Sequence, residues 1–401
     1  MNARNTVHPV EIARSLQPLL AEFAAEAEEN GRASEVVIEA IRKAGLFSIM
    51  FPKRAGGVGN KLITHIETVA ELGKTCPGTA WAYGLLSGVT ASAASLPKAT
   101  KDKIFITGDE LVCSVAAQTG SCTPDGEFYR VSGRWGYASG CMHADWALNG
   151  VKILNADGDI IDVGFAIIPL KTSSHVRIEN TWHVAGVCGS GSNTIIAEDQ
   201  LIPSELVLSF SKLRANLKDN PAALAALEAR DKWPVEPLFP LGVLSPMLGA
   251  ASAILDHVQN GMCQRPIIGW SYDSQSHSQV FVQQLGEAAM EIESAWLHIR
   301  RAASEIDETA QSRQLTGYEK ARIQADCGYA MRILRNAGER LMDIAGPAAF
   351  ANSSPLQRFW RDLNVGTRHT ALNTRLSLEL YGRARLEQES NLALLPNIQK
   401  E

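Results

Sequence analysis

The chain has 401 residues, of which 45% are hydrophobic and 20% are charged, and this length is sufficient for two or three packed domains. Its net charge of −5 comes from interleaved acidic and basic residues without a block of Lys and Arg, which excludes the electrostatic signature of a nucleic-acid-binding protein. The seven cysteines have neither C-x-x-C nor Cys/His spacing, which argues against a zinc site and against a disulfide framework. We expect no metal, and buried thiols in a reducing cytoplasm.

The first hundred residues have the hydrophobic spacing of helices. Apolar side chains recur at helical intervals, for example Leu62, Ile66, Val69 and Leu72, and Asn-Gly or Gly positions end the segments. We predict an N-terminal helical domain over residues 1–110.

From about residue 111 the pattern becomes strand-like. Segments such as "LVCSVAA", "EFYRVSGRWGY" and "GFAIIPL" are rich in β-branched and aromatic residues, and Asp125-Gly126 and Asp157-Gly158 are typical hairpin turns. We predict a compact central β domain over residues 111–225, with a long polar excursion between Ser211 and Trp233.

Helical spacing returns after Pro234. Between Val280 and Ile306 one helical face carries apolar residues, namely Leu285, Ala288, Ile292, Trp296 and Ile299. A helix of this length needs partners for its apolar face, so we predict a C-terminal helical bundle over residues 226–401 that associates into a tetramer. The order of helices, strands and helices, without βαβ alternation, indicates an α+β fold.

Nothing in the sequence predicts a membrane protein. The N-terminal residues lack the apolar core of a signal peptide, and the longest apolar stretch, Gly242 to Leu255, is too short and too interrupted to span a bilayer. We expect a soluble cytoplasmic protein.

Three stretches resemble acyl-CoA dehydrogenases. "FPKRAGGVGN" (residues 51–60) resembles their Pro-x-x-x-Gly-Gly-x-Gly turn, "GVCGSGSNTIIAEDQLIPSELVL" (186–208) their Gly-x-x-x-Ser-x-Thr segment, and "PLQRFWRDLNVGTRH" (355–369) their Arg-Asp element. The resemblance covers nearly the whole chain. It implies the acyl-CoA dehydrogenase fold, which has N-terminal helices, a central β barrel and a C-terminal four-helix bundle that usually mediates tetramers.

One branch of this family is more similar. "WGYASGCMHADW", "GVCGSGSNT" and "QRFWRD" followed by His369 resemble the oxygenase components of two-component flavin monooxygenases, the group that includes hydroxyphenylacetate and hydroxylated-steroid-ring hydroxylases. Two departures from the dehydrogenases favour this branch. Thr370 stands where many dehydrogenases have the glutamate that removes the α-proton of an acyl-CoA, so that base is missing. The Gly-Gly-x-Gly run that helps to hold FAD reads "GPAAF" (346–350), which leaves less room for the backbone to approach a dinucleotide and favours FMN.

The resemblance implies a monooxygenase that hydroxylates an aromatic or heteroaromatic substrate, of phenol, indole or polycycle type, through a C4a-hydroperoxyflavin. Reduced FMN or FADH2 would come from a separate NAD(P)H:flavin reductase, because the sequence has no nicotinamide-binding βαβ unit, and O2 would be the cosubstrate. The alternatives are an N-oxygenase of an amino sugar, an acyl-CoA dehydrogenase-like flavoenzyme and a non-catalytic flavin-binding protein.

Two residues take catalytic roles from the resemblance. The hydroxyl group of Ser139 would lie close to flavin N5 and hold its proton, and the imidazole of His369 would hydrogen-bond the distal peroxide oxygen and supply the proton that lets the hydroxyl group transfer to the substrate. For each there is a plainer alternative: Ser139 as a tolerated polar residue on a strand, and His369 as a packed helical residue.

Further residues are implied to bind the cofactor or the substrate. We expect the cofactor to contact Ser139, Ser114, Ser190, Ser192, Thr194 and, through its phosphate, Arg265. The glycine-rich turn that carries three of them continues into a strand, so it is not a dinucleotide fingerprint. We expect the substrate to contact His143, Trp81 and Ser114, although a structural role for His143 at a strand end fits equally well.

The helix predicted around Trp81 bears on the substrate class. Phenol hydroxylases of this branch often carry a histidine there that assists deprotonation of the phenol, whereas "TAWAYGLLSGVTASAASLP" (79–97) contains none and is rich in small residues. This suggests an indole or a bulky polycycle, with close helix packing as the alternative. The arginines and aspartate of "RFWRD", Arg358, Arg361 and Asp362, anchor their helix through an ion pair or touch the flavin.

Overall fold

The computed structural model describes residues 7–212 and 227–400. Six α-helices form the N-terminal part of the chain. They are α1 (Pro9–Ser15), α2 (Gln17–Glu29), α3 (Glu35–Lys43), α4 (Leu62–Gly73), α5 (Pro77–Ala94) and α6 (Lys98–Ile104). The four apolar residues expected on one face, Leu62, Ile66, Val69 and Leu72, are all buried on α4, so the predicted helical spacing is confirmed. Most of the predicted polar excursion, residues 213–226, lies outside the described residues.

Seven strands follow and form one sheet. They are β1 (Val112–Asp125), β2 (Phe128–Ala138), β3 (Trp146–Leu154), β4 (Ile160–Pro169), β5 (Val176–Glu179), β6 (Asn193–Pro203) and β7 (Val207–Ser209). Their order is β5-β6-β2-β1-β3-β4-β7, with β1 and β3 parallel and the other neighbouring pairs antiparallel. The predicted turns at Asp125-Gly126 and Asp157-Gly158 are confirmed, since they join β1 to β2 and β3 to β4. In the described residues the strand order ends in two edge strands, β5 and β7. The predicted barrel would have no such edges.

A buried tryptophan occupies the centre of this sheet. Gly120 of β1 faces Gly133 of β2, and a Cβ atom at either position would lie less than 3 Å from the ring of Trp135. The two glycines therefore leave the space that the indole fills, and its Nε1 donates to the carbonyl of Gly150 at 2.8 Å. Trp135 is therefore a packing residue of the sheet.

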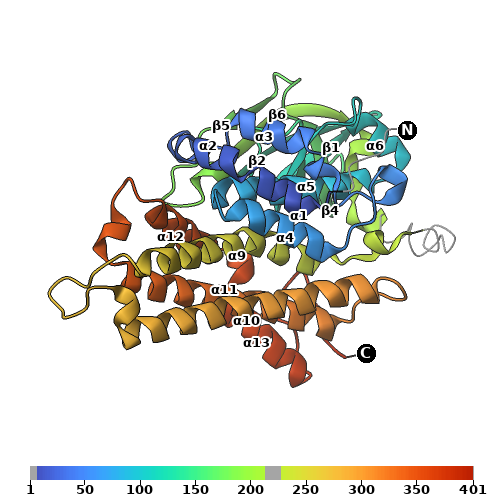
Figure 1. Ribbon diagram of the computed structural model, residues 1–401. Coiled ribbons are helices and arrows are strands. Elements are labelled where there is room, and N and C mark those ends of the chain that lie inside the picture. Colours follow the sequence, from blue (N-terminus) through green and yellow to red (C-terminus); the bar gives the residue numbers. More distant parts are fainter. Residues whose placement is uncertain (1–6, 213–226, 401) are drawn as a thin grey trace.

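The C-terminal part consists of long helices. They are α9 (Val235–Met262), α10 (Gln279–Thr309), α11 (Gly317–Ala345), α12 (Pro355–Gly366) and α13 (Thr374–Arg385). The helix expected between Val280 and Ile306 is α10, and α11 packs against α9, α10 and α13. Figure 1 shows the sheet and the N-terminal helices in the upper half of the molecule, α10, α11 and α13 in the lower half, and α9 between the halves.

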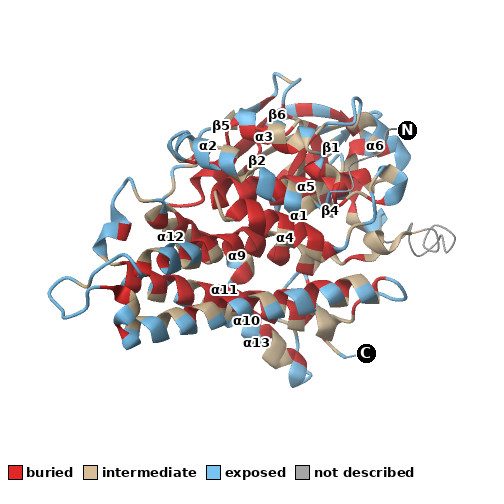
Figure 2. Cartoon of the chain, viewed as in Figure 1, coloured by how far each residue is buried: buried red, intermediate tan, exposed pale blue. Residues whose placement is uncertain are grey.

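Helix α9 joins the two halves through buried apolar residues (Figure 2). It packs against α4 at close range, because a Cβ atom at Gly249 would lie 2.1 Å from the carbonyl oxygen of Ala70. By length and composition α9 is apolar enough to cross a membrane, and it is longer than the stretch considered in the sequence, but 72% of its most apolar window is buried within the protein. It is a core helix of this fold.

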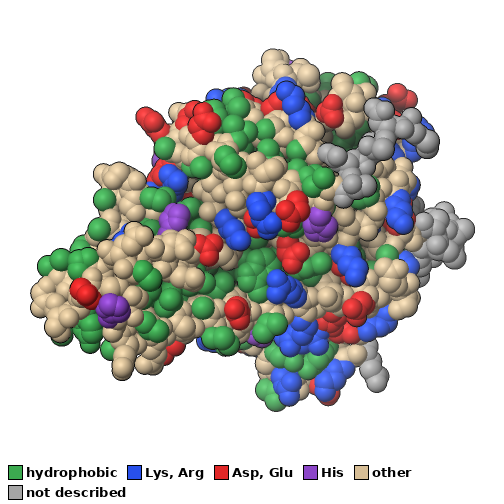
Figure 3. Space-filling view, in the orientation of Figure 1, with side chains coloured by type: hydrophobic (Ala, Val, Ile, Leu, Met, Phe, Trp, Pro, Cys, Tyr) green, Lys and Arg blue, Asp and Glu red, His purple; other side chains and the backbone are tan. Residues whose placement is uncertain are grey.

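The surface carries both signs of charge, as one face shows in Figure 3, where Lys and Arg side chains are interspersed with Asp and Glu. Six of the seven cysteines are buried, whereas Cys263 is exposed, which corrects the expectation for that residue. Burial raises the pKa of Cys141 to about 12, so this thiol stays protonated and unreactive at neutral pH.

Candidate active site

Four of the predicted site residues form one continuous row. The hydroxyl oxygens of Ser192 and Ser139 are 2.7 Å apart, and Nε1 of Trp81 donates to the hydroxyl oxygen of Ser139 at 3.2 Å. The far side of the Trp81 ring faces the imidazole of His369, with 5.9 Å between ring centroids. The row thus brings together residues from the sheet, from α5 and from the segment after α12, which are up to 288 positions apart in the sequence.

Ser139 lies in the turn that follows β2, and the backbone there is unusual. Tyr137 has φ +61° and Gly140 has φ +74°, and left-handed backbone at a bulky residue such as tyrosine is a feature that clusters at functional sites. The amide of Gly140 donates to the carbonyl of Ser190 at 2.9 Å. This hydrogen bond fixes the turn of Ser139 against the neighbouring glycine-rich turn.

That glycine-rich turn, residues 186–192, is called the serine turn below. It contains the short 3-10 helix η3 (Cys188–Ser190) and runs into β6 with no helix after it, as predicted. The hydroxyl groups of Ser190 and Ser192 are 2.8 Å apart and both side chains are buried. The row of hydroxyl groups therefore continues from Ser139 through Ser192 to Ser190.

His369 lies directly after α12, and its ring orientation is defined by its neighbours. It caps the 3-10 helix η8 (Thr370–Leu372), where its Nδ1 accepts the amide hydrogen of Ala371 at 3.2 Å. The imidazole also packs edge-on against Phe239 of α9, at 5.4 Å between centroids. Because Nδ1 accepts a hydrogen bond, the neutral ring carries its proton on Nε2.

This geometry predicts a pH dependence. Burial lowers the pKa of His369 from its ordinary value of 6.5, and protonation of Nδ1 would break the hydrogen bond from Ala371. We expect the contribution of His369 to product formation to be constant above about pH 7 and to fall as the pH drops below about 6.5. The measurement is the ratio of wild-type to His369→Ala product yield across pH; a ratio that falls with rising pH would contradict the neutral donor.

Two family models match this chain. One is the acyl-CoA dehydrogenase N-terminal domain, over residues 11–100, and the other is the acyl-CoA dehydrogenase C-terminal domain, over residues 241–374. Together they match more than half of the chain. The chain belongs to the acyl-CoA dehydrogenase family.

Within this family its relatives are flavin-dependent monooxygenases. The oxygenase subunit HsaA of Rhodococcus jostii is 27% identical over 376 residues, which are 92% of this chain and 95% of the relative. The oxygenase component of FADH(2)-dependent resorcinol hydroxylase from a Rhizobium species is also 27% identical and covers 87% of each chain. The solved structure of XiaF from a Streptomyces species, in complex with FADH2 and glycerol, is 29% identical, has a TM-score of 0.89 and covers 96% of both chains.

Two further hydroxyl residues were expected to contact the cofactor, and both form hydrogen bonds with residues outside the row. Ser114 of β1 donates to the carbonyl of Leu148 at 2.6 Å, and the hydroxyl of Thr194 is 2.7 Å from that of Thr181. Within the described residues no hydrogen bond joins either hydroxyl to Ser139. Their roles at the cofactor stay predictions.

His143 and Arg265 have other surroundings than the side chains of the row. The imidazole of His143 is buried and lies 3.2 Å from the carboxylate of Glu35 on α3, a contact that favours the structural role. Arg265 is exposed in the loop after α9. Met247 of the same helix packs beside the row. Because a helix rises about 1.5 Å per residue, the end of α9 at Met262 lies roughly 22 Å from Met247. Arg265 can meet a cofactor phosphate only at the far end of α9 or across a subunit interface.

The sequence interpretation missed three aromatic side chains. Phe239 contacts His369, and Tyr137, which is 79% exposed, packs edge-on against Trp182 at 5.9 Å. Trp182 donates through Nε1 to the carbonyl of Val187 in the serine turn at 3.3 Å. The one signal in the sequence that could have pointed to Trp182 is its place shortly before the Gly-rich run.

The Arg-Asp element proves to hold the serine turn. Arg361 forms an ion pair with Glu28 of α2 and donates to the carbonyl of Ala185 at 2.6 Å, so the predicted ion pair is confirmed. Asp362 is buried and accepts the amide hydrogen of Val187 at 2.5 Å. In the described part of the chain, no three His, Cys, Asp or Glu side chains gather as metal ligands would.

Proposed function

We propose that this chain is the oxygenase component of a two-component flavin-dependent monooxygenase that hydroxylates an aromatic substrate. The observation that carries the proposal is the row of Ser192, Ser139, Trp81 and His369, which ends in hydroxyl groups on one side and in an imidazole on the other. The names of the relatives, oxygenase subunit HsaA and resorcinol hydroxylase, support this reaction class.

The residues of the row fit a reduced flavin. The polar edge of a flavin ring alternates N–H donors with carbonyl acceptors, and hydroxyl groups serve both because each can donate and accept. The side chains of Ser139, Ser192 and Ser190 form such an edge. When bound, a reduced flavin supplies the electrons that activate O2. The hydroxyl of Ser139 would hold the proton at flavin N5, and the surrounding buried side chains would exclude water.

His369 would act at the oxygen that is transferred. Its Nε2–H is the free donor of the neutral ring, because Nδ1 is engaged with the amide of Ala371. A hydrogen bond from this donor would assist transfer of the hydroxyl group to the substrate, in which the O–O bond breaks as the new bond to the substrate forms and the oxygen left behind takes a proton. Acyl-CoA dehydrogenation is disfavoured, since the place of its base is taken by Thr370, an exposed hydroxyl residue.

The side chains near the row favour an uncharged aromatic substrate. Trp81 and Phe239 supply ring surfaces, and α5 has no charged residue and no histidine along its whole length. Its face between Leu85 and Val89 is partly exposed and includes Gly88, beside which a Cβ atom would meet open space. Because α5 carries no histidine that could deprotonate a phenol, an electron-rich indole or a polycycle is the substrate class that we propose.

The reduced flavin would come from a separate NAD(P)H:flavin reductase. The described sheet has one parallel pair, β1 and β3, and these strands are connected through β2 without a helix, so no nicotinamide-binding βαβ unit is present in the described residues. We propose free diffusion of FMNH2 or FADH2 between the two proteins in the cytoplasm. FADH2 is named for the resorcinol hydroxylase and for the XiaF complex, and FMN for the complex of TdsC from a Paenibacillus species, so both flavins belong in the test.

The test of this function is a single-turnover reaction. Purified protein is mixed with photoreduced FMN or FAD, O2 and a panel of indoles, polycyclic aromatics, phenols and an amino sugar, with no reductase present. We expect a product with one added oxygen from an indole or a polycycle. Oxidation of NADH by this chain alone, or bleaching of its bound FAD by an acyl-CoA, would contradict the proposal; N-oxidation of the amino sugar would identify the alternative activity.

We also propose a tetramer formed through the C-terminal helices. Val282, Met290 and Leu297 lie on the outer face of α10 and are 48%, 64% and 67% exposed, an apolar surface that suits a second copy of the chain. We expect light scattering to give the mass of four chains, and the double variant Met290→Glu/Leu297→Glu to lower it. A charge reversal on α6, Lys98→Glu, serves as the control. A wild-type monomer would contradict the assembly.

A further inference from the structure

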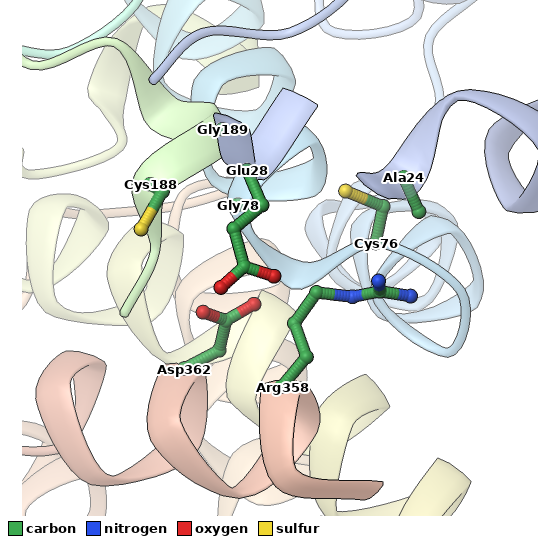
Figure 4. Close-up of a pocket in the computed structure, with 8 residues that line it drawn as sticks. All are labelled: Ala24, Glu28, Cys76, Gly78, Cys188, Gly189, Arg358 and Asp362. Carbon is green, nitrogen blue, oxygen red and sulfur yellow. The ribbon is translucent and has the colours of Figure 1, made fainter. Parts of the chain in front are cut away.

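A small polar cavity lies beside the serine turn, and no residue of the row lines it. It is lined by Ala24, Glu28, Cys76, Gly78, Cys188, Gly189, Arg358 and Asp362, which come from α2, α5, α12 and the turn itself. Figure 4 shows the carboxylates of Glu28 and Asp362 pointing toward each other, while the guanidinium of Arg358 extends away from them toward Cys76. The row of hydroxyl groups does not use these charges.

The serine turn begins in a strained conformation. Val187 has φ +51°, in the left-handed region that a β-branched residue rarely adopts, and such a residue persists only when its surroundings hold it. The amide of Val187 donates to Oδ1 of Asp362, with 2.5 Å between nitrogen and oxygen. One residue earlier the backbone lies directly on α12, because a Cβ atom at Gly186 would be 2.5 Å from the carbonyl oxygen of Arg361.

The position of Val187 affects the hydroxyl groups through a chain of hydrogen bonds. Its carbonyl accepts the amide hydrogen of Ser190 at 3.0 Å, and the carbonyl of Ser190 in turn accepts from Gly140 at 2.9 Å. Ser190 then contacts Ser192, and Ser192 contacts Ser139. A change at Val187 therefore reaches Ser139 through Ser190, which connects to it both by the backbone hydrogen bond to Gly140 and by the hydroxyl row.

We propose that Asp362 is a positioning residue for the reaction: its carboxylate holds Val187 in the left-handed conformation and thereby aims Ser190 and Ser192 at Ser139 and at the flavin edge. The part concerning the flavin rests on the proposed function, whereas the part concerning the turn stands on the contacts alone. Asp362 lies behind the turn and acts through Val187.

The charges around the cavity make this contact depend on pH. Burial, together with Glu28 of α2, raises the pKa of Asp362 to about 7, although the hydrogen bond from Val187 and the charges of Arg361 and Arg358 of α12 act to lower it. The thiols of Cys76 and Cys188 also face the cavity. An ionised carboxylate accepts a hydrogen bond more strongly than a neutral carboxyl group. The hold on Val187 therefore strengthens as the pH rises through about 7. The folded-state pKa lies above the unfolded value, so the same ionisation lowers the free energy of unfolding over this range.

The experiment compares three variants by hydrogen exchange of the flavin-free protein. Asp362→Leu removes the acceptor, and the amides of residues 186–193 are expected to exchange roughly tenfold faster, the consequence of losing one buried hydrogen bond. Asp362→Asn keeps a neutral acceptor oxygen and is expected to exchange as the wild type does at about pH 6, below the pKa of Asp362. Asp362→Leu/Val187→Gly is expected to recover most of the protection, since glycine adopts a positive φ without strain. Asp326→Leu removes a buried carboxylate between α10 and α11 and is the matched control, with no selective change in residues 186–193.

The functional readout uses reduced flavin and substrate. Asp362→Leu is expected to weaken oxidised-flavin binding and to raise the ratio of hydrogen peroxide to product, and the ratio of wild-type to Asp362→Asn coupling is expected to rise between about pH 6 and pH 8. If Asp362→Leu does not fold, this pH comparison decides, and superimposable wild-type and Asp362→Asn profiles would overturn the inference. Unchanged exchange in Asp362→Leu would also overturn it. If no substrate is oxygenated, the proposed function fails while the exchange data still test the role of Asp362.

Discussion

Replacing His369 by alanine is expected to lower the yield of hydroxylated product roughly 100-fold, the lower range for loss of a general acid, while reduced flavin still binds. The reason is geometric. The imidazole is held between Trp81 and Phe239 with Nδ1 engaged by Ala371, so Nε2–H is the one ring donor free to reach the transferred oxygen. Without it, oxygen consumption should continue and end in hydrogen peroxide.

The measurement is product and hydrogen peroxide per reduced flavin in a single turnover. His369→Gln places an amide donor near the position of Nε2 and is expected to recover part of the product yield. His277→Ala, which removes an exposed histidine paired with Asp273, is the control and should behave as the wild type. If His369→Ala couples oxygen to product as well as the wild type does, the role of the imidazole is wrong even though the family assignment stands.

Replacing Ser139 by alanine is expected to raise the hydrogen peroxide released per product roughly tenfold and to leave folding intact. Its hydroxyl lies at the centre of the row, in contact with Ser192 and Trp81, and the loss of one buried hydrogen bond corresponds to about a tenfold change in rate. Under the proposed function this hydroxyl holds the proton at flavin N5, so its removal speeds the wasteful release of peroxide.

Two variants distinguish this role from a structural one. Ser139→Thr keeps the hydroxyl and is expected to stay closer to the wild type in coupling than Ser139→Ala. Ser132→Ala removes a hydroxyl from β2, the strand that leads to Ser139, where it accepts from the amide of Asp199, and is expected to leave coupling unchanged. Equal coupling in Ser139→Ala and Ser132→Ala would sink the assignment of Ser139.

The sequence by itself determined the elements and their order. The spacing of Leu62, Ile66, Val69 and Leu72 predicted α4, and the Asp-Gly pairs predicted the turns of two hairpins, because these signals depend on residues within one or two turns of each other. The motifs resembling the flavin monooxygenases also named Ser139 and His369, although no spacing of 230 residues can place one near the other.

Only the tertiary structure decided what these residues touch. His143 was expected at the substrate or at a strand end, and its contact with Glu35 could not be read from its neighbours in the chain. The Arg-Asp element suggested an ion pair, but not that Asp362 accepts the amide of Val187, 175 positions earlier. The physical reason is that periodicity and turn chemistry act over a few residues, whereas a strained backbone such as that of Val187 exists only once α12 packs against the serine turn and supplies the acceptor.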